Sequence, residues 1–161
     1  MEYRDLYDEN KTLTGEKIKK GDSVPKGKYY LTVAVWIQNN KNEFLLQINK
    51  KYNMWTTTGG HPKTGETSLD GIVTEIKEEL GVDVDRNCLI LFKTIKTEDD
   101  FVDLYYIKQN INLDDITMQD EEVDSVKWFS IDEINQLINE NKFLPPHIDF
   151  YHDCLDYLNE Q

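Results

Sequence analysis

Cysteine is scarce in this chain of 161 residues, which has only Cys88 and Cys154. Neither has a partner at the short spacing of metal sites, so we expect both thiols to be reduced. Long apolar runs are also missing, because no segment approaches the roughly 18 apolar residues that a membrane span requires. The charged first ten residues lack the apolar core of a signal peptide. These absences predict a cytoplasmic protein without a membrane partner.

Basic residues are few compared with acidic ones, with 18 Lys and Arg against 31 Asp and Glu and a net charge of −13. A surface of this sign repels nucleic acid and anionic lipid, so we expect no nucleic-acid partner. It would also repel a phosphate substrate unless bound cations reversed the local sign. The acidity could equally serve solubility alone.

Repeats and low-complexity segments are absent, and the length suits one domain over residues 1–161 with a proper core. Residues 1–27 have the pattern of a β-hairpin extension. Strands are predicted at 29–38, 44–50, 88–97, 101–109 and 123–130, and helices at 131–142 and 147–161. Because most strands follow one another across short turns, we expect pairing through hairpins and an α+β fold with a mixed sheet.

The segment GHPKTGETSLDGIVTEIKEELGV, residues 60–82, predicts a polar loop followed by a helix. Thr67 and Asp70 have the spacing of a capping box, with Asp in place of the usual Glu or Gln. Gly81 is a natural C-terminal cap. Apolar residues at helical spacing predict a face directed toward the core, formed by Leu69, Ile72, Val73, Ile76 and Leu80.

Three glutamates, Glu75, Glu78 and Glu79, fall within an arc of roughly 100° beside that apolar face. Like charges at this spacing repel each other slightly. Either water screens them, as on an ordinary solvated acidic face, or a cation lies among them. Hard divalent cations such as Mg²⁺ prefer oxygen ligands and share their shell with substrate phosphates. Gly71, one turn earlier on the same side, would leave room beside the carboxylates.

Residues 60–82 closely resemble the Nudix box, which has a glycine, a glutamate six residues later, and then Arg-Glu-(aliphatic)-x-Glu-Glu-x-Gly-(aliphatic). The sequence matches this pattern at Gly60, Glu66, Glu75, Ile76, Glu78, Glu79, Gly81 and Val82. It departs at one position, where Thr74 replaces the arginine. The order of strands and the segment VDSVKWFSIDEI also resemble a Nudix domain, so the resemblance extends from around Lys28 onward.

The resemblance implies an α/β/α sandwich around a mixed sheet, here with an N-terminal β-hairpin and a C-terminal helix. It also implies an enzyme that hydrolyses a diphosphate linkage in a nucleoside diphosphate linked to another moiety, by attack of water on phosphorus. The expected partner is therefore a small-molecule diphosphate. Many members of the family are dimers, so a homodimer is compatible with the resemblance.

Carried onto this chain, the resemblance implies that Glu75, Glu78 and Glu79, with the Gly60 carbonyl, hold Mg²⁺ or Mn²⁺. Such ions neutralise a diphosphate and lower the pKa of an attacking water. Glu75 and Glu78 are then catalytic as well as metal-binding, and the base is either Glu78 or an acid from a nearby loop. The loop candidates, each of which could equally be a solvated acid, are Glu122, Glu121, Asp99 and Asp100.

Thr74 leaves a second interpretation open. In the family the arginine helps to hold the box carboxylates, and a threonine cannot make bidentate contacts to a carboxylate. The chain could therefore be a sensor that binds a nucleotide or diphosphate without turnover. In either case Glu66 is expected to orient the loop, and Gly81 to end the helix.

The segments MWTTTGGHP and DLYDENKTLTG resemble the Nudix branch related to isopentenyl-diphosphate isomerase. Gly59 stands where that enzyme has its catalytic cysteine, and no histidine precedes the loop, so isomerase chemistry is the least favoured alternative. Trp55 and His61 are the candidate substrate-binding residues. Trp55 could stack on a base or pack under the sheet, and His61 could touch metal or phosphate or face solvent.

Overall fold

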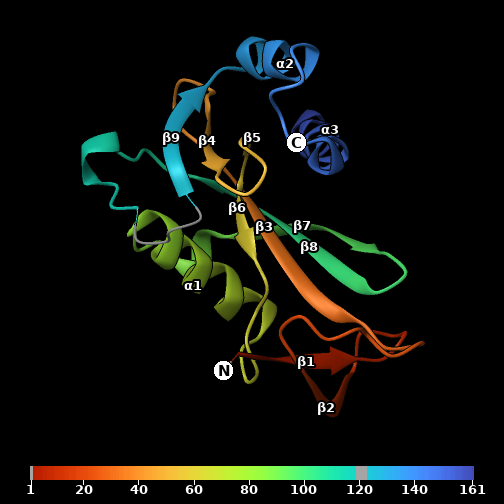
Figure 1. Ribbon diagram of the computed structural model, residues 1–161. Helices are drawn as coiled ribbons and strands as arrows, with labels where there is room; N and C mark the ends of the chain where they lie inside the picture. The colour runs from red at the N-terminus through yellow and green to blue at the C-terminus, as the bar shows by residue number, and fades with distance from the viewer. Residues whose placement is uncertain (1, 119–122) are drawn as a thin grey trace.

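The computed structural model describes residues 2–118 and 123–161 (Figure 1). Strands β1 (Tyr3–Tyr7) and β2 (Leu13–Lys19) pair antiparallel, as predicted for an N-terminal hairpin. The later elements are β3 (Tyr30–Gln38), β4 (Phe44–Asn49), β5 (Met54–Thr56), β6 (Thr58–Gly60), α1 (Ser68–Leu80), β7 (Ile90–Lys96), β8 (Asp100–Lys108), β9 (Val123–Phe129), α2 (Ile131–Asn139) and α3 (Ile148–Asn159). Single 3₁₀ turns cover Arg86–Cys88, Leu113–Asp115 and Pro145–His147. Within the described ranges, no helix is long and apolar enough to cross a membrane.

Strand β3 is central to the main sheet. It pairs in parallel with β8 from Tyr30 opposite Asp100 to Gln38 opposite Lys108. Strand β7 then pairs antiparallel with β8, which confirms the hairpin predicted for these two segments. The sheet contains both parallel and antiparallel pairs, so the prediction of a mixed sheet is also confirmed.

The hairpin pairing expected between β3 and β4 is wrong for most of their length. The two strands meet only where Gln38 faces Phe44, and β4 then pairs with β5 and β9 instead. The edge of β3 is taken by β6, with Ala34 opposite Gly59. A short turn constrains only the residues beside it, whereas the partners of the remaining strand are chosen by packing across the sheet. Because β6 occupies the place beside β3 that was expected for β4, Gly59 and Gly60 lie next to the central strand.

Helices cover both faces of the sheet (Figure 1). Successive residues of β3 point to opposite faces, and both sets are apolar, so each face needs a cover. On one side, aliphatic residues of β3 pack against α1, whose Ile72, Ile76 and Leu80 are fully buried. On the other side, Trp36 packs with Ile134 of α2 and Tyr151 of α3. The result is the α/β/α sandwich that the sequence predicts.

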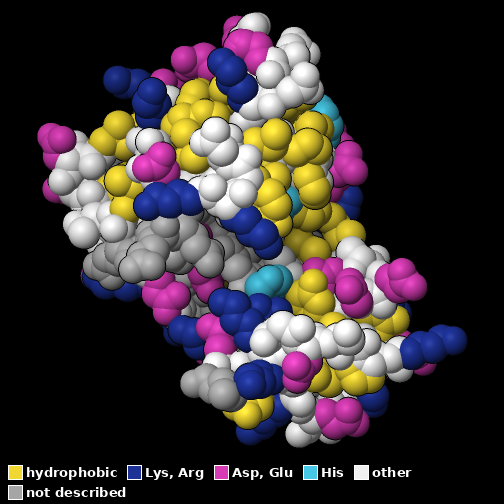
Figure 2. Space-filling model, in the orientation of Figure 1, with side chains coloured by type: hydrophobic (Ala, Val, Ile, Leu, Met, Phe, Trp, Pro, Cys, Tyr) yellow, Lys and Arg dark blue, Asp and Glu magenta, His cyan; other side chains and the backbone are white. Residues whose placement is uncertain are grey.

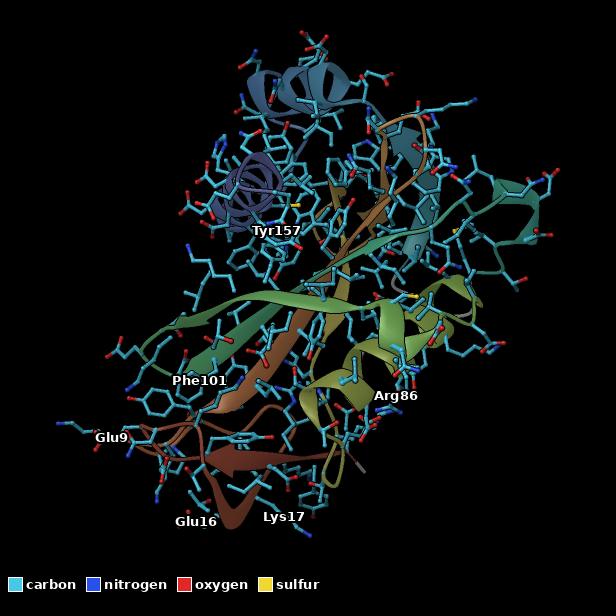
Figure 3. All side chains as sticks on the ribbon, turned by 180° about the vertical axis from the view of Figure 1, so that it is seen from behind. Glu9, Glu16, Lys17, Arg86, Phe101 and Tyr157 are labelled. Atoms are coloured by element: carbon cyan, nitrogen blue, oxygen red, sulfur yellow. The ribbon has the colours of Figure 1, made fainter. Side chains whose placement is uncertain are left out.

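Helix α3 and the N-terminal hairpin lie toward opposite ends of β8, as Figure 3 shows from behind. Tyr157 of α3 stacks on Phe92 of β7, with ring centroids 5.0 Å apart. At the other end, Phe101 of β8 lies 5.0 Å from the ring of Tyr29, next to the hairpin. The hairpin therefore borders the end of the sheet from which β3 and β8 start.

Candidate functional site

Helix α1 begins and ends as predicted. Oγ1 of Thr67 accepts a hydrogen bond from the Asp70 N–H, and Oδ2 of Asp70 accepts one from the Thr67 N–H, both at 3.1 Å, so the capping box is confirmed. A hydrogen bond from Arg86, followed by the interactions of the carboxyl with the backbone and side chain of Thr67, lowers the pKa of Asp70 to about 2. Gly81 ends the helix with φ of 69°, a left-handed conformation that disfavours residues with a Cβ.

The loop between β6 and α1 is fastened to the helix through Glu66. Its Oε1 accepts a hydrogen bond of 2.8 Å from the Lys63 N–H, and its Oε2 accepts one of 2.8 Å from the Thr74 hydroxyl. Thr74 therefore has a partner in the box, although its side chain is shorter than the arginine of the family pattern. These two contacts place Glu66 where it orders the loop.

Gly71 makes room for the loop rather than for the carboxylates, which corrects the expectation from the helical arc. A Cβ on Gly71 would lie 2.5 Å from Cγ and 2.8 Å from Cβ of Pro62. Real Cβ atoms do not approach other carbons so closely, so Pro62 packs directly on the helix backbone. The contact holds the loop against the first half of α1.

Glu79 is buried and is held by the strands that face it. Its Oε1 accepts a hydrogen bond of 3.1 Å from Nε2 of Gln47, and its Oε2 accepts one of 3.2 Å from the Gly59 N–H. The orientation of the Gln47 amide is in turn set by a 2.9 Å hydrogen bond from the Thr58 hydroxyl. The side chain is only 6% exposed, so this carboxylate has a defined position at the floor of the site.

Glu75 and Glu78 lie one turn and one residue before Glu79, nearer the loop. A Cβ on Gly60 would lie 2.5 and 2.6 Å from the two carboxylate oxygens of Glu75, so the Glu75 carboxylate lies directly against this glycine. Glu78 is 44% exposed and forms an ion pair of 2.9 Å with Nζ of Lys63. This hydrogen bond raises the pKa of the Lys63 ammonium.

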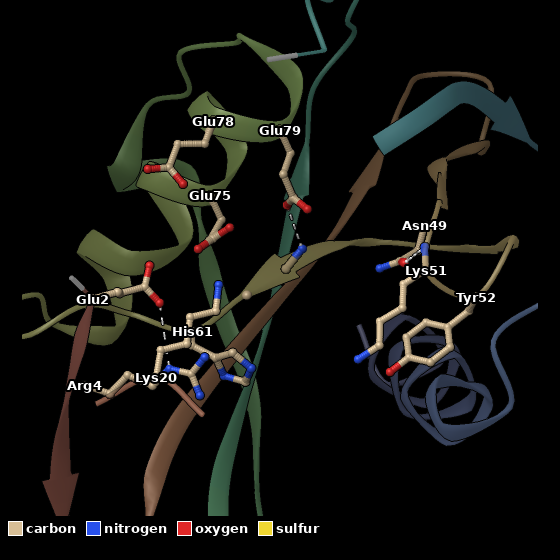
Figure 4. A pocket seen from close by; sticks show the side chains of 12 residues that line it. Glu2, Arg4, Lys20, Asn49, Lys51, Tyr52, His61, Glu75, Glu78 and Glu79 are labelled. Carbon is tan, nitrogen blue, oxygen red and sulfur yellow. Dashed lines mark hydrogen bonds and ion pairs between the residues drawn. The ribbon is translucent and has the colours of Figure 1, made fainter. Parts of the chain in front are cut away.

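The three carboxylates lie along one side of α1, as predicted (Figure 4). They point toward different neighbours, however, and within the described ranges no three His, Cys, Asp or Glu side chains converge as a ready metal cluster. Their donor chemistry still suits Mg²⁺ or Mn²⁺, which take carboxylate oxygens and leave positions for water and phosphate. The metal-binding roles of Glu75, Glu78, Glu79 and Gly60 remain predictions.

A cavity of about 400 Å³ opens beside these carboxylates. Its opposite side carries positive charge from Arg4 and Lys20, at the N-terminal hairpin, and from Lys51 after β4 (Figure 4). Sequence reasoning missed all three, because nothing in the pattern of a hairpin indicates which distant residues it will face. The described residues that line this cavity are Glu2, Arg4, Lys20, Asn49, Lys51, Tyr52, Gly59, Gly60, His61, Glu75, Glu78 and Glu79.

A second cavity of about 570 Å³ adjoins the first and shares Asn49, Gly59, Gly60, His61 and Glu79 with it. Its lining combines apolar side chains with hydroxyl groups. The residues particular to it include Tyr30, Thr32, Val33, Ala34, Thr56, Thr57, Ile95, Thr97, Asp100, Val102, Pro146, His147, Asp149 and Phe150. Figure 2 shows basic side chains, a histidine and apolar side chains together on this face. A ligand could therefore span a charged compartment and a more apolar one.

His61 lies where the two cavities meet. Its Nδ1 is 3.2 Å from Oγ1 of Thr32 and 3.3 Å from the carbonyl oxygen of Leu31, so the ring is not simply facing solvent. Burial, together with the positive charge of Arg4, lowers the pKa of His61. The ring is therefore neutral at pH 7, with Nδ1 placed to donate to the Leu31 carbonyl.

The structure does not bring every candidate residue to the site. Trp55 packs edge-on against Phe129, with ring centroids 4.8 Å apart, and it is not among the described residues that line either cavity. The ring contact of Trp55 is thus a packing contact, and its role in binding substrate stays a prediction. Asp100 lines the second cavity and accepts a 2.7 Å hydrogen bond from Thr32, whereas Asp99 is exposed. The remaining base candidates, Glu121 and Glu122, lie outside the described residues.

Comparison with known proteins agrees with this geometry. The profile of the NUDIX domain matches residues 28–154. An uncharacterised Nudix hydrolase of Listeria monocytogenes is 31% identical to the chain over 151 residues, which cover 90% of this chain and 89% of the relative. Another, from Clostridium acetobutylicum, is 31% identical and covers 86% of this chain and 74% of the relative.

Solved structures show the same fold. A protein of Deinococcus radiodurans superposes with a TM-score of 0.71 at 18% identity, over 88% of this chain and 91% of that one. The NUDIX domain of NrtR from Shewanella oneidensis, solved in complex with ADP ribose, superposes with a TM-score of 0.66 at 15% identity, over 81% of this chain and 88% of that one. The matched profile covers most of the chain, and the chain therefore belongs to the NUDIX domain family, as a Nudix pyrophosphohydrolase.

Proposed function

We propose that this chain hydrolyses the diphosphate linkage of a nucleoside diphosphate joined to another moiety, in a reaction that depends on Mg²⁺ or Mn²⁺. One observation carries the proposal: Glu75, Glu78 and Glu79 line one side of a cavity whose other side is basic. Phosphate groups need both, since cations balance their charge and carboxylates hold the metal that accompanies them. The adjoining larger cavity leaves space for the groups attached to the diphosphate.

The donor set of the proposed metal site consists of Glu75, Glu78, Glu79 and the Gly60 carbonyl. A divalent ion bound there supplies charge neutralisation and a more acidic water. Glu79, held by Gln47 and Gly59, provides a fixed oxygen ligand with little reorganisation. Most of the catalytic effect then comes from positioning and charge, as in other phosphoryl transfers.

Glu78 is our choice for the base that accepts the proton of the attacking water. Its side chain is 44% exposed, and its ion pair with Lys63 can exchange for a substrate contact. Glu122 is the alternative base from the sequence. Glu75 sits against Gly60, close to the backbone of the site, and is better placed to hold metal.

Hydrolysis should be assayed with a panel of nucleoside diphosphate compounds that begins with ADP-ribose, the ligand of the similar Shewanella domain. Product phosphomonoesters are detected as phosphate after phosphatase treatment, with Mg²⁺, Mn²⁺ or EDTA present. We expect turnover with metal only, and a loss of at least about 100-fold in Glu79→Gln, which corresponds to roughly 2.7 kcal/mol. Glu140→Gln, at the exposed end of α2, is the matched control.

A second function, a sensor that binds without turnover, is favoured by one observation, the threonine at the position of the box arginine. Calorimetry separates the two functions. Metal and ligand binding without turnover of any panel member would support the sensor, whereas no metal binding in the presence of ligand would contradict both. Isomerisation stays the least favoured alternative because Gly59 has no side chain to act as acid or nucleophile.

The cellular setting follows from the same proposal. A small-molecule diphosphate is the proposed partner, in the cytoplasm, with neither nucleic acid nor membrane required. We also propose that residues 1–161 act as one domain and that the chain is compatible with a homodimer. Sedimentation of the purified chain tests the last point directly.

A further inference from the structure

We propose that the N-terminal hairpin is part of the active site, and that Arg4 and Lys20 bind the phosphate groups of the substrate opposite the carboxylates of α1. The inference rests on the proposed function, because it takes the bound anion to be the substrate's diphosphate. The hairpin precedes residues 28–154, which match the family profile, so these cations are an addition to the matched domain. They are binding residues in this account and take no part in proton transfer.

The hairpin is firmly docked, as a binding wall must be. Nζ of Lys11 lies 2.7 and 2.8 Å from the two carboxylate oxygens of Asp103, which is fully buried in β8. Tyr7 and Tyr29 exchange backbone hydrogen bonds of 2.8 and 2.9 Å. This ion pair fixes the position of the hairpin relative to β8, since separating the two side chains would leave the charge of Asp103 buried without Lys11.

The hairpin also contacts the box loop directly. The Thr64 N–H donates to the Tyr3 carbonyl at 2.9 Å, and the Gly65 N–H donates to Oδ2 of Asp5 at 3.0 Å. The same loop is joined to α1 through Glu66. The basic wall and the acidic wall of the cavity are thus held in one connected framework.

Arg4 has a buried donor that no described residue satisfies. Its side chain is only 14% exposed, and its Nε has no hydrogen-bond partner within the described ranges. The nearest carboxylate oxygen, Oε2 of Glu2, is 4.0 Å away, which is too far for a hydrogen bond. The guanidinium carbon lies 5.7 Å from the centre of the Tyr30 ring, within the range of a cation–π contact.

A buried guanidinium donor without an acceptor is unfavourable unless a ligand provides one. Phosphate oxygens match the planar donor fork of arginine, and a phosphate would not add another carboxylate to an already acidic cavity. Figure 4 shows Arg4 and Lys20 reaching into the cavity from the hairpin, with Glu75 and Glu78 above them. A phosphate between these two walls would contact arginine on one side and the proposed metal site on the other.

The adjoining cavity is a poorer place for phosphate. Its described lining contains no Lys or Arg, and it contains the carboxylates of Asp100 and Asp149. The pKa of His147 in this lining is lowered to about 4 by burial, so this ring is neutral at pH 7 as well. The anionic part of the substrate therefore belongs beside Arg4, and the less charged part belongs in the larger cavity.

The test is binding of inorganic pyrophosphate, measured by calorimetry with and without MgCl₂, so that no turnover of a nucleotide is required. We expect Arg4→Gln to weaken binding about 10- to 100-fold, as for loss of a hydrogen bond to a charged group. Arg4→Lys should recover part of the affinity, since it keeps the charge but not the fork. Lys20→Gln should weaken binding by a smaller factor of about 3 to 10, because its exposed ammonium is screened by water.

The matched control is Arg86→Gln, which removes the same charge at the only other arginine of the chain. Arg86 pairs with Asp70 on the surface and does not line the described cavity. We therefore expect the pyrophosphate affinity of Arg86→Gln to stay within twofold of that of the unaltered protein. Thermal unfolding of each variant shows whether the fold is kept. If Arg4→Gln does not fold, Lys20→Gln and Arg4→Lys still provide the comparison, because Lys20 is exposed and Arg4→Lys preserves the charge.

Two results would overturn the inference: unchanged pyrophosphate affinity in the folded variants, or no pyrophosphate binding by the unaltered protein in either condition. Failure of the proposed function looks different. If the protein binds pyrophosphate through Arg4 but hydrolyses no panel compound, the role of Arg4 is supported and the proposed hydrolase function is contradicted. For any substrate that is hydrolysed, Arg4→Gln should raise KM more than it lowers kcat, whereas general unfolding would lower the active fraction and leave KM unchanged.

Discussion

The hydroxyl of Thr74 donates a 2.8 Å hydrogen bond to Oε2 of Glu66, and so joins α1 to the loop that precedes it. The same carboxylate accepts the Lys63 N–H through its other oxygen. A short side chain thereby fastens Glu66 from the position where the family pattern has an arginine. This contact joins the loop and the helix at a second point, in addition to the ion pair between Lys63 and Glu78.

Replacing Thr74 with valine keeps the shape of the side chain and removes the hydroxyl. We expect Thr74→Val to lower the free energy of unfolding by about 1–2 kcal/mol, because Glu66 loses a donor. Turnover should fall as well, since the loop beside Gly60 is less ordered. Urea unfolding and initial rates check both effects. Thr74→Ser retains the hydroxyl and is the control, and equal stability of the valine variant and the unaltered protein would contradict the role of this hydrogen bond.

Alanine at Gly71 should destabilise the protein, although alanine normally favours a helix by about 1 kcal/mol over glycine. The reason is the 2.5 Å approach of the added Cβ to Cγ of Pro62, and overpacking of this kind costs about 1–3 kcal/mol. Chemical denaturation measures the change. The loss should shrink in a Pro62→Gly background, where the ring is gone, and a more stable Gly71→Ala protein would refute the contact.

Acid should weaken the folded state through His147. Burial lowers its pKa from the ordinary 6.5 to about 4, so the unfolded chain takes up a proton first as the pH falls. The corresponding stability is fully present above pH 6.5 and is lost as the pH falls toward 4, with a magnitude of about 2–3 kcal/mol. His147→Asn lacks this titration. The difference in the free energy of unfolding between the unaltered protein and His147→Asn should therefore become smaller from pH 7.5 to pH 4.5. A constant difference would show that protonation of His147 does not destabilise the fold.

The two cysteines should differ sharply in reactivity. Cys88 is exposed, whereas Cys154 is buried in α3 and burial raises its pKa to about 12. Only thiolates react rapidly with disulfide reagents. Titration with Ellman's reagent at pH 8 should detect one thiol per native chain and two in urea. Cys88→Ser should leave the native protein unreactive, and rapid reaction of Cys154 in that variant would show that α3 opens readily.

Local patterns predicted much of the fold. The capping box of Thr67 and Asp70, the left-handed cap at Gly81 and the buried face of α1 all depend on residues close together in the chain. The β7–β8 hairpin was likewise predictable from its short turn. The parallel pairing of β3 with β8 was not, because it joins strands separated by the whole of α1 and depends on how the helices cover the sheet.

The candidate site also has residues that the sequence could predict and residues that it could not. Glu66, Glu75, Glu78 and Glu79 could be named from the spacing of residues 60–82, since one helix and its loop hold them together. The packing of Trp55 against Phe129 could not, because two strands from different parts of the chain create it. Nor could the partner of Thr74, which depends on how the loop folds back over α1.

Residues 60–82 thus contain enough information to bring carboxylates to one side of a helix, because a helical repeat fixes their relative directions whatever the rest of the chain does. Which groups face those carboxylates was decided by the tertiary structure alone. Arg4 and Lys20 reach the same cavity only because contacts such as the ion pair of Lys11 with the buried Asp103 dock the hairpin on the sheet. Contacts over such chain separations depend on the packing of the whole molecule, which no local pattern records.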